Sequence, residues 1–577
     1  MVGSKWPERA SKRRLMVLWL GTVLAVLILT GRLFYWQVIR HKELRNIGER
    51  WQLLDRPIPA LRGKIMDQHG FMLATDEYEF EIFASPMDID APDILATELA
   101  PILGRDQGVL AKLLSQKGGT YVPLARRVPL EKARRVEKIR NDLNQTALGI
   151  SAAAKRGYPG KQMACHLLGF VTRDREVFYG VEEFYDDELR GIEGSWGGAS
   201  DVLDFNVGLG PAQVILPQDG RDVILTVDCR IQQIAEEELL KAISEFRAEG
   251  GTIIVMGPRT GAVLAMTSYP SYDPNLYFGE AIREEVFTNP AISTPYEPGS
   301  VFKVITMASA LDSGMYGRDS TYNDVGQILV GGNLIRNWDR RAYGVRTMTE
   351  LLGYSLNVGA ATLSTELGSE RFYSYLRRFG FGEVTGIDLP HESAGTLRLP
   401  GDADWHDADL GTNAFGQGIA VTPIQMITAI AAVANDGVLP TPYIVQRIEL
   451  EGETIEEFHP RPGRRVISSL VARELTEMLV ESLEGKENLS IPGYAIAGKT
   501  GTAQIPITGG YDPEGTVGAF VGYAPARDPQ FIVLVKIDRP KESPWGTVVA
   551  VPAFRQIAQK LFIYMGIPPD QVRMASR

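Results

Sequence analysis

The residues of this sequence best suited to chemistry are a serine and a lysine three positions apart, in Ser300-Val-Phe-Lys303. A serine hydroxyl is a poor nucleophile until a neighbouring base removes its proton. Residues three apart on a helix share one face, so Lys303 would lie beside Ser300. Burial and nearby positive charge favour the neutral lysine that such a base requires. The pair therefore predicts a nucleophile and its base at the entrance of a buried helix over residues 301–311.

A second polar stretch, Ser355-Leu-Asn357, lies between Gly353 and Gly359. The Ser355 hydroxyl could relay a proton from Lys303 to a leaving amine. The Asn357 amide can both donate to a peptide carbonyl and accept from a donor. We therefore predict that Ser355 and Asn357 complete the catalytic set.

A third stretch, Lys499-Thr-Gly-Thr502, follows an apolar run that predicts an edge strand. A glycine in a strand permits close approach of another backbone, and an extended peptide can pair along such an edge. We expect Lys499, Thr500, Gly501 and Thr502 to bind the substrate and its terminal carboxylate. The backbone N–H groups of Ser300 and Thr502 are candidate donors to an oxyanion.

Each stretch has an ordinary structural alternative when it is taken alone. Ser300 could be a helix cap beside an exposed lysine, 355–357 a polar turn, and Lys499 a solvated residue on an edge strand. The occurrence of all three stretches in the order Ser-x-x-Lys, Ser-x-Asn, Lys-Thr-Gly favours the catalytic interpretation over these alternatives. This order is typical of serine enzymes that are acylated by penicillin and by D-alanyl-D-alanine peptides.

Bulk properties exclude several classes of protein. The chain has 577 residues, 44% of them hydrophobic and 23% charged, so a multidomain globular protein is expected rather than a disordered one. Its net charge of -11 argues against a general nucleic-acid binder. The two cysteines, Cys165 and Cys229, are too few for a disulfide framework. One bridge is an alternative, but two unpaired, buried thiols are favoured, because Cys165 lies in an apolar run.

An apolar segment over residues 15–39 is long enough to cross a membrane. Basic residues precede it, which predicts a cytoplasmic tail over residues 1–14. A cleavable signal peptide is the alternative, but bulky aromatic residues occupy 34–36, where a small-residue cleavage site would be needed. We predict an uncleaved anchor with everything after residue 40 on the outer side.

Alternating and periodic patterns divide the rest of the chain. The pattern of residues 40–220 predicts a mixed, non-catalytic module with helices at 92–103 and 129–140. The module ends at 216–220 in a linker that contains a proline and an Asp-Gly pair. Strands are expected at 223–227, 251–256, 262–266, 518–522 and 531–537, with a helix at 231–246. Strands at both ends of 221–577 suggest one antiparallel sheet covered by helices.

With these motifs, the second half of the chain resembles the transpeptidase domain of penicillin-binding proteins. Further stretches carry the same resemblance, among them Tyr272-Asp-Pro-Asn275, Phe415-Gly-Gln-Gly418 and Phe520-Val-Gly522. The first half is similar to class B members through Arg62-Gly-Lys-Ile-Met-Asp67, Arg156-Gly-Tyr-Pro159 and Gly180-Val-Glu182. Leu356 departs from the smaller polar residue that many relatives carry, at a position with no assigned chemistry.

The resemblance implies an α+β chain with the penicillin-binding serine transpeptidase fold, an antiparallel sheet with helices on both faces. A transmembrane helix and an elongated pedestal (40–220) would precede this transpeptidase domain (221–577). It also implies a D,D-transpeptidase that cross-links peptidoglycan stem peptides, is inhibited by β-lactams, and uses no metal or cofactor. A SEDS-type glycosyltransferase in the membrane is the expected partner, since no glycosyltransferase domain is evident here. A division role is favoured weakly over elongation.

Three other functions compete with this one. A D,D-carboxypeptidase or β-lactamase would resolve the acyl-enzyme with water, and class A β-lactamases hold that water with a glutamate. No counterpart of that glutamate is evident in the sequence. A membrane-anchored β-lactam sensor would usually need further membrane spans or a cytoplasmic output domain, and residues 1–14 are too short for such a domain. A purely scaffolding role conflicts with the complete set of motif residues.

Overall fold

The computed structural model describes residues 8–40, 53–116, 121–199, 213–278 and 283–575. Within it the chain forms two compact units. Unit 1 comprises Met1–Ala60, Glu79–Ala153 and Ile192–Gln218, and unit 2 comprises Leu61–Tyr78, Ala154–Gly191 and Asp219–Arg577. Part of the predicted cytoplasmic tail, residues 1–7, lies outside the described residues.

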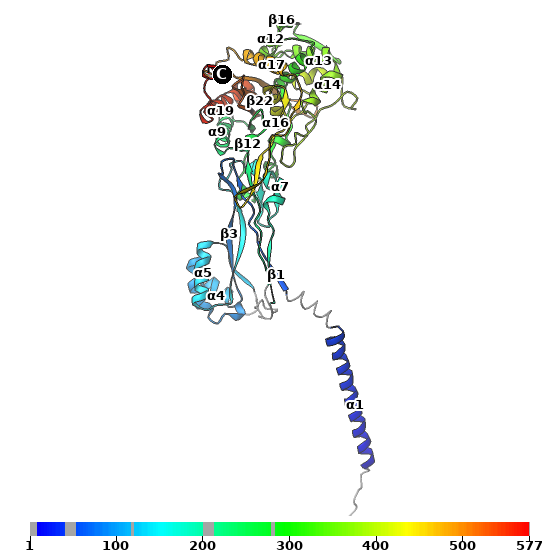
Figure 1. Ribbon diagram of the computed structural model, residues 1–577, viewed down its shortest axis with the longest axis vertical. Coiled ribbons are helices and arrows are strands. Elements are labelled where there is room, and N and C mark those ends of the chain that lie inside the picture. The colour runs from blue at the N-terminus through cyan, green and yellow to red at the C-terminus, as the bar shows by residue number, and fades with distance from the viewer. Residues whose placement is uncertain (1–7, 41–52, 117–120, 200–212, 279–282, 576–577) are drawn as a thin grey trace, which may run out of the picture. The chain divides into compact units, whose positions relative to one another are not determined.

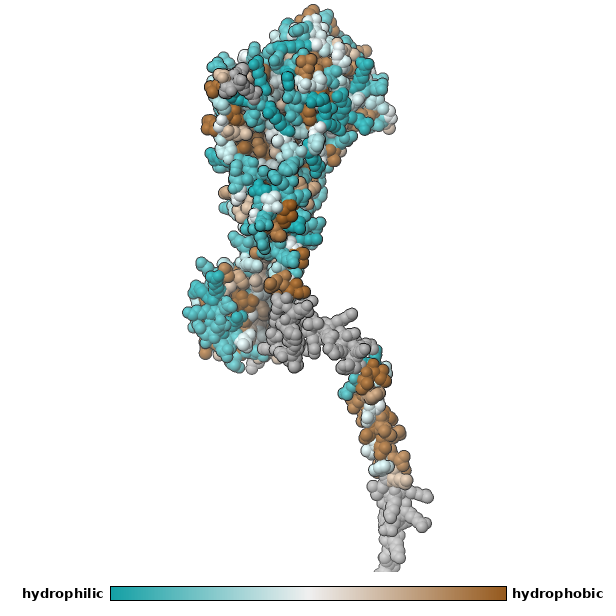
Figure 2. Space-filling model, in the orientation of Figure 1, coloured by the Kyte–Doolittle hydropathy of each residue, from teal (hydrophilic) through white to brown (hydrophobic). Residues whose placement is uncertain are grey.

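Unit 1 begins with helix α1 (Glu8–Phe34), which continues into a π-helical turn, η1 (Tyr35–Ile39). The stretch Met16–Ile39 is long and apolar enough to cross a membrane, and Figure 2 shows hydrophobic residues along it. Its two threonine hydroxyls are satisfied internally, since Thr22 Oγ1 donates to the Leu18 carbonyl at 2.9 Å and Thr30 Oγ1 to that of Val26 at 2.7 Å. These features fit the predicted single-pass membrane anchor.

The remainder of unit 1 is a small mixed body. Helices α3 (Pro92–Leu103), α4 (Gln107–Leu114) and α5 (Leu130–Asp142) pack with strand β4 (Val122–Pro129) around one buried cluster. The two longer helices confirm those expected at 92–103 and 129–140. A separate antiparallel sheet has the order β1 (Leu53–Ile58), β8 (Gly194–Ala199), β9 (Gln213–Ile215).

Unit 2 is organised by a five-stranded antiparallel sheet. Its strands, in spatial order, are β12 (Val263–Tyr269), β11 (Gly250–Met256), β23 (Phe531–Asp538), β22 (Gly510–Ala524) and β21 (Ala497–Ile507). Strands from both ends of the catalytic segment therefore meet in one sheet, as predicted. Strand β21, which carries Lys499 to Thr502, lies at its edge.

Alternating side chains of this sheet face two helical layers. On β11, Ile253 and Val255 join the cluster formed with α9 (Cys229–Phe246) and α19 (Val551–Tyr564), which lie side by side in Figure 1. Ile254 and Met256 face the cluster of α11 (Lys303–Asp312) and α16 (Pro423–Ala434). Both faces of the strand are buried, which explains its continuous apolar run. The expected helices on both faces are confirmed.

Unit 2 also contains segments from the first half of the chain, Leu61–Tyr78 and Ala154–Gly191. Strands β19 (Glu453–Glu457), β18 (Val445–Leu450) and β10 (Asp222–Leu225) continue through β2 (Ile65–Met66) into the first part of β3 (Met72–Ala84). Ile65 pairs in parallel with Val223. Segments 61–78 and 154–191 thus fold with the catalytic unit, although the predicted module boundaries place them in the pedestal.

A buried ion cluster holds these early segments inside unit 2. Glu182, which has no exposed surface, accepts from Arg62 Nε and Arg156 Nε, both at 2.6 Å, and from the Tyr158 hydroxyl at 3.1 Å. Arg156 also contacts Asp76 at 3.2 Å. Burial raises the Glu182 pKa, but the two arginines outweigh it and hold the pKa below its usual value. The three N-terminal motifs quoted above therefore meet at one carboxylate.

Candidate active site

Ser300 lies in a short 3-10 helix, η5 (Gly299–Phe302), and Lys303 is the first residue of α11. The predicted α-helix over 301–311 is thus wrong in its first turn, where Val301 and Phe302 belong to the 3-10 segment. A 3-10 helix has three residues per turn, so residues three apart are aligned on it. This tighter turn places Lys303 Nζ 3.0 Å from Ser300 Oγ.

Lys303 is 1% exposed, and its nitrogen has four neighbouring acceptors. The Ser355 carbonyl lies 2.6 Å away, Asn357 Oδ1 2.7 Å and Ser355 Oγ 3.2 Å, in addition to Ser300 Oγ. A neutral amine has two N–H groups and one lone pair. If the two shortest contacts take the N–H groups, the lone pair is left for the Ser300 hydroxyl.

The orientation of the Asn357 amide follows from its second contact. Its Nδ2 donates to the Arg336 carbonyl at 3.2 Å, so Oδ1 is the atom that faces Lys303. Burial, followed by the charge of Lys499, lowers the Lys303 pKa well below its ordinary value. The geometry and the electrostatics both favour a neutral lysine that can act as a base.

Ser355 occupies a backbone conformation that is unusual for a serine. It ends helix α12 (Met348–Tyr354) with a φ of 58°, and α13 (Asn357–Leu367) begins two residues later. Such left-handed residues cost free energy and are often held at functional sites. Leu356, between the two polar residues, is fully buried in the core. Its departure from the smaller polar residue of many relatives therefore adds packing and does not change the cleft.

Strand β21 carries the third motif, Lys499-Thr-Gly-Thr502, and places it beside Ser355. Lys499 is 3% exposed and donates from Nζ to Ser355 Oγ at 3.1 Å and to the Thr500 carbonyl at 3.1 Å. Burial and then the charge of Lys486 lower the Lys499 pKa to about 7. Thr502 Oγ1 accepts from the backbone N–H of Gly546 at 3.0 Å.

Two glycines allow the nucleophile segment to lie against this strand. A Cβ on Gly501 would lie 2.8 Å from Val301 Cγ2 and 3.0 Å from the Pro298 carbonyl oxygen. Gly299 has a φ of +53°, and a Cβ there would lie 2.9 Å from the Thr502 carbonyl oxygen. Side chains at either position would push η5 away from β21 and separate Ser300 from Thr502.

A cleft of about 510 Å³ opens over these groups. It is lined by Ser300, Ser355, Asn357, Thr500, Gly501 and Thr502, together with residues that sequence reasoning did not assign: Trp338, Tyr354, Gln417, Lys486, Trp545 and Thr547. The rings of Trp338 and Trp545 meet edge to face with centroids 5.8 Å apart, and both are largely exposed. Gln417 lies in a quoted family stretch, but no local pattern marks Lys486 or the tryptophans.

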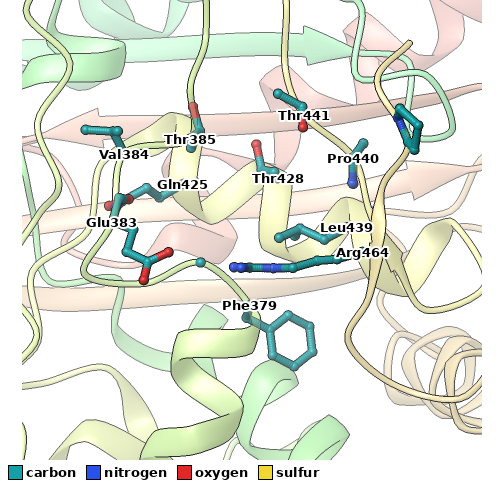
Figure 3. Close-up of a pocket in the computed structure, with 12 residues that line it drawn as sticks. Phe379, Glu383, Val384, Thr385, Gln425, Thr428, Leu439, Pro440, Thr441 and Arg464 are labelled. Carbon is teal, nitrogen blue, oxygen red and sulfur yellow. The ribbon is translucent and has the colours of Figure 1, made fainter.

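Unit 2 has a second pocket of about 240 Å³, bounded by Phe379, Glu383, Thr428, Leu439 and Arg464 (Figure 3). In Figure 3, Arg464 lies across the pocket, and its Nη2 donates to the Arg377 carbonyl at 3.0 Å. The described residues that line this pocket include no serine, cysteine, lysine or histidine. This pocket therefore offers no pairing of a serine or cysteine nucleophile with a lysine or histidine base.

The cysteines are unpaired, as predicted, although only Cys165 is buried and Cys229 is partly exposed, and His166 is a buried residue of the core. Cys165 and Cys229 are both free thiols. His166 is buried, donates from Nε2 to the Val286 carbonyl at 3.0 Å, and has its pKa lowered by burial to about 4.

Comparison with known proteins decides the family. Residues 251–559 match the penicillin-binding protein transpeptidase domain, and residues 57–225 match the penicillin-binding protein dimerisation domain. The chain belongs to the class B penicillin-binding proteins. It is 33% identical to stage V sporulation protein D of Bacillus subtilis, over 97% of this chain and 86% of that protein. It is 31% identical to the probable peptidoglycan D,D-transpeptidase PbpC of Pseudomonas aeruginosa, over 98% and 97%.

Solved structures agree with this assignment. Penicillin-binding protein 3 of Mycobacterium tuberculosis in complex with aztreonam superposes with a TM-score of 0.68 at 26% identity, covering 89% of this penicillin-binding protein and 98% of that chain. Penicillin-binding protein 2X of Streptococcus thermophilus, at 23% identity and a TM-score of 0.78, shares the fold over 89% of this chain and 80% of that one.

Proposed function

We propose that this D,D-transpeptidase acylates on Ser300 and that Lys303 is the base. Ser300 Oγ attacks the carbonyl of the penultimate D-alanine of a stem peptide, and Lys303 takes its proton. The observation that carries this assignment is the buried Lys303, 3.0 Å from Ser300 Oγ, with its pKa held well below normal. A base is effective when its pKa lies near the working pH.

The substrate is proposed to pair with the edge of β21. Lys499, Thr500 and Thr502 receive the terminal carboxylate of the donor peptide, and Gly501 keeps the strand close to the nucleophile. The N–H groups of Ser300 and Thr502 stabilise the oxyanion. Penicillin acylates the same serine because its carboxylate and strained amide present the same groups.

The second half of the reaction transfers the acyl group to an amine of another stem peptide. Ser355 lies between Lys303 and Lys499 and relays the proton to the departing D-alanine, while Asn357 holds Lys303 and the substrate amide. The described residues that line the cleft include no aspartate or glutamate. This favours transpeptidation over hydrolysis by a class A β-lactamase route.

The test uses the full chain in detergent with a stem-peptide donor and a second stem peptide as acceptor. Mass spectrometry should detect the cross-linked dimer and a Ser300-linked acyl-enzyme, and Ser300→Ala should abolish both. An acyl adduct on another residue, or hydrolysis products alone at saturating acceptor, would contradict the assignment.

The topology and domain limits are also part of the proposal. Residues 1–14 face the cytoplasm, 15–39 anchor the chain, 40–220 form the pedestal and 221–577 carry the catalytic domain outside, with segments 61–78 and 154–191 of the pedestal range folding with the catalytic unit. The basic flank and the apolar span support this orientation. Protease added to intact spheroplasts should remove the catalytic domain; protection of that domain would reverse the orientation.

A SEDS-type glycosyltransferase is the proposed membrane partner, because a class B chain must act where nascent glycan strands are made. A division role is favoured, and a fluorescent fusion should localise at midcell. Replacing residues 15–39 with an unrelated membrane helix should weaken both co-purification and cell-wall function. If both survive, the helix serves only as an anchor.

A further inference from the structure

Lys486 is a cation on the wall of the catalytic cleft to which the reaction above assigns no role. It lies in the loop between α17 (Ser469–Ser482) and β21, and it is partly buried. Burial is the cause that lowers its pKa, and among the described residues no carboxylate forms an ion pair with it. A partly buried cation without a counter-ion costs free energy that a bound anion would recover.

The loop that carries Lys486 is held firmly in unit 2. Asn488 Nδ2 donates to the Thr547 carbonyl at 3.1 Å, and Arg555 Nε donates to the Ser490 carbonyl at 3.2 Å. Leu489 and Ile491 are buried in the cluster beneath α19. Lys486 is therefore placed at the cleft by a fixed backbone.

On the cleft side, Lys486 faces the charge of Lys499, whose pKa it lowers, and the described cleft lining contributes no acidic side chain. Glu484 and Glu487 flank Lys486 in the loop and line a neighbouring pocket with it. Neither carboxylate forms an ion pair with Lys486 among the described residues. Two adjacent cations repel each other, and a carboxylate placed between them would remove that repulsion. The proposed function uses Lys499 for the terminal carboxylate of the donor, which departs with D-alanine.

We propose that Lys486 binds a carboxylate adjacent to the acceptor amine and so selects acceptors of the amino-carboxylate class. This inference rests on the proposed function. The incoming amine must occupy the position that the D-alanine amine has left, so a carboxylate beside it falls near Lys499 and Lys486. The amine nitrogen forms a bond to the acyl carbon, the ester bond to Ser300 Oγ breaks, and the amine proton passes to Ser300 Oγ through Lys303.

The experiment measures partition of the acyl-enzyme in the full-length protein. A thioester analogue of the donor acylates Ser300, and D-alanine or D-alaninamide serves as acceptor, so the probes differ by one carboxylate. The ratio of their aminolysis efficiencies is compared between wild type, Lys486→Gln, Lys486→Arg and the control Lys241→Gln, an exposed lysine on α9. Comparing ratios between variants cancels the different basicities of the two amines.

We expect Lys486→Gln to lower the D-alanine to D-alaninamide ratio about tenfold or more, the usual loss for a hydrogen bond to a charged group, through the KM of D-alanine. Lys486→Arg and Lys241→Gln should keep the wild-type ratio. An unchanged ratio in Lys486→Gln, or an equal loss with both acceptors, would overturn the proposal. Absence of a thioester-derived adduct on Ser300 would instead refute the proposed function, and penicilloyl stoichiometry by mass spectrometry shows that each variant is folded.

Discussion

The Lys499 ammonium donates to the Ser355 hydroxyl oxygen at 3.1 Å. Lys303 approaches the same oxygen at 3.2 Å, so one hydroxyl connects two lysines whose pKa values are both lowered by burial. The arrangement separates their roles. Lys303 also reaches Ser300 and is suited to move a proton, while Lys499 also reaches the backbone of β21 and is suited to hold a carboxylate.

Replacing Lys303 with arginine should abolish base catalysis while it retains a cation. Arginine cannot lose its proton near neutral pH, so we expect acylation by benzylpenicillin to slow by at least roughly a hundredfold, the lower range for general-base catalysis. Stopped-flow or gel-based acylation kinetics give the rate, with Lys241→Arg as the matched control. Near-normal acylation by the Lys303→Arg protein would refute the role of Lys303 as base.

Ser355→Ala should separate substrates by their leaving groups. A peptide donor releases an amine that must be protonated, whereas a thioester releases a thiolate that needs no proton. We expect acylation by the peptide to fall roughly a hundredfold, with a much smaller loss for the thioester. Equal losses for both donors would show that Ser355 orders the site without relaying the proton.

The kcat/KM for acylation should fall above neutral pH, and the pH at which it falls should depend on the charge of Lys486. Lys303 must be neutral, so kcat/KM rises as Lys303 loses its proton. Lys499 must be charged to hold a carboxylate, so kcat/KM falls as pH rises through its pKa of about 7. Lys486→Gln removes a charge that lowers this pKa, so the descending limb should move to higher pH. Lys241→Gln should leave it in place, and an unmoved limb in Lys486→Gln would contradict the electrostatic link.

The ion cluster at Glu182 should contribute strongly to stability. Glu182→Gln leaves Arg62 and Arg156 buried without their shared carboxylate, and breaking such a pair costs about 3–5 kcal/mol. Chemical denaturation followed by tryptophan fluorescence should show this loss. Asp187→Asn is the control, since its contact with Arg190 is on the surface and such pairs contribute about 1 kcal/mol or less. A Glu182→Gln protein as stable as the control would show that hydrogen bonds alone hold the cluster.

The main elements of the fold could be predicted because their patterns are local. The apolar runs at 251–256 and 531–537 are buried on both faces, and their length and bounding turns mark them as strands. The 3-10 turn at Ser300 could not be predicted, because it depends on Gly299 and Gly501 admitting two backbone segments that are distant in sequence. The discontinuous membership of unit 2 was missed for a similar reason, since the partners of the Arg62 side chain, Glu182 and Asp186, lie more than a hundred positions away along the chain.

The site residues could be predicted from the motifs, but the separate role of each residue could be assigned only from the structure. The spacing of Ser300 and Lys303 indicates contact, yet only the four contacts of Lys303 show where its lone pair points. Lys486 has no motif around it. Its place on the cleft wall comes from the buried Leu489 and Ile491, which fix the loop, and such anchoring is not visible in a short sequence window.

The pairing of Ile65 with Val223 has a consequence for how the chain is made. The protein emerges amino end first, so β2 is synthesised long before β10, the strand with which it pairs in parallel. Meanwhile residues 79–153, which belong to unit 1, can already condense around their own buried cluster. The enzyme is therefore assembled in an order different from its sequence, because the non-catalytic cluster can form while β2, already able to pair with β3 on one edge, still lacks β10 on the other.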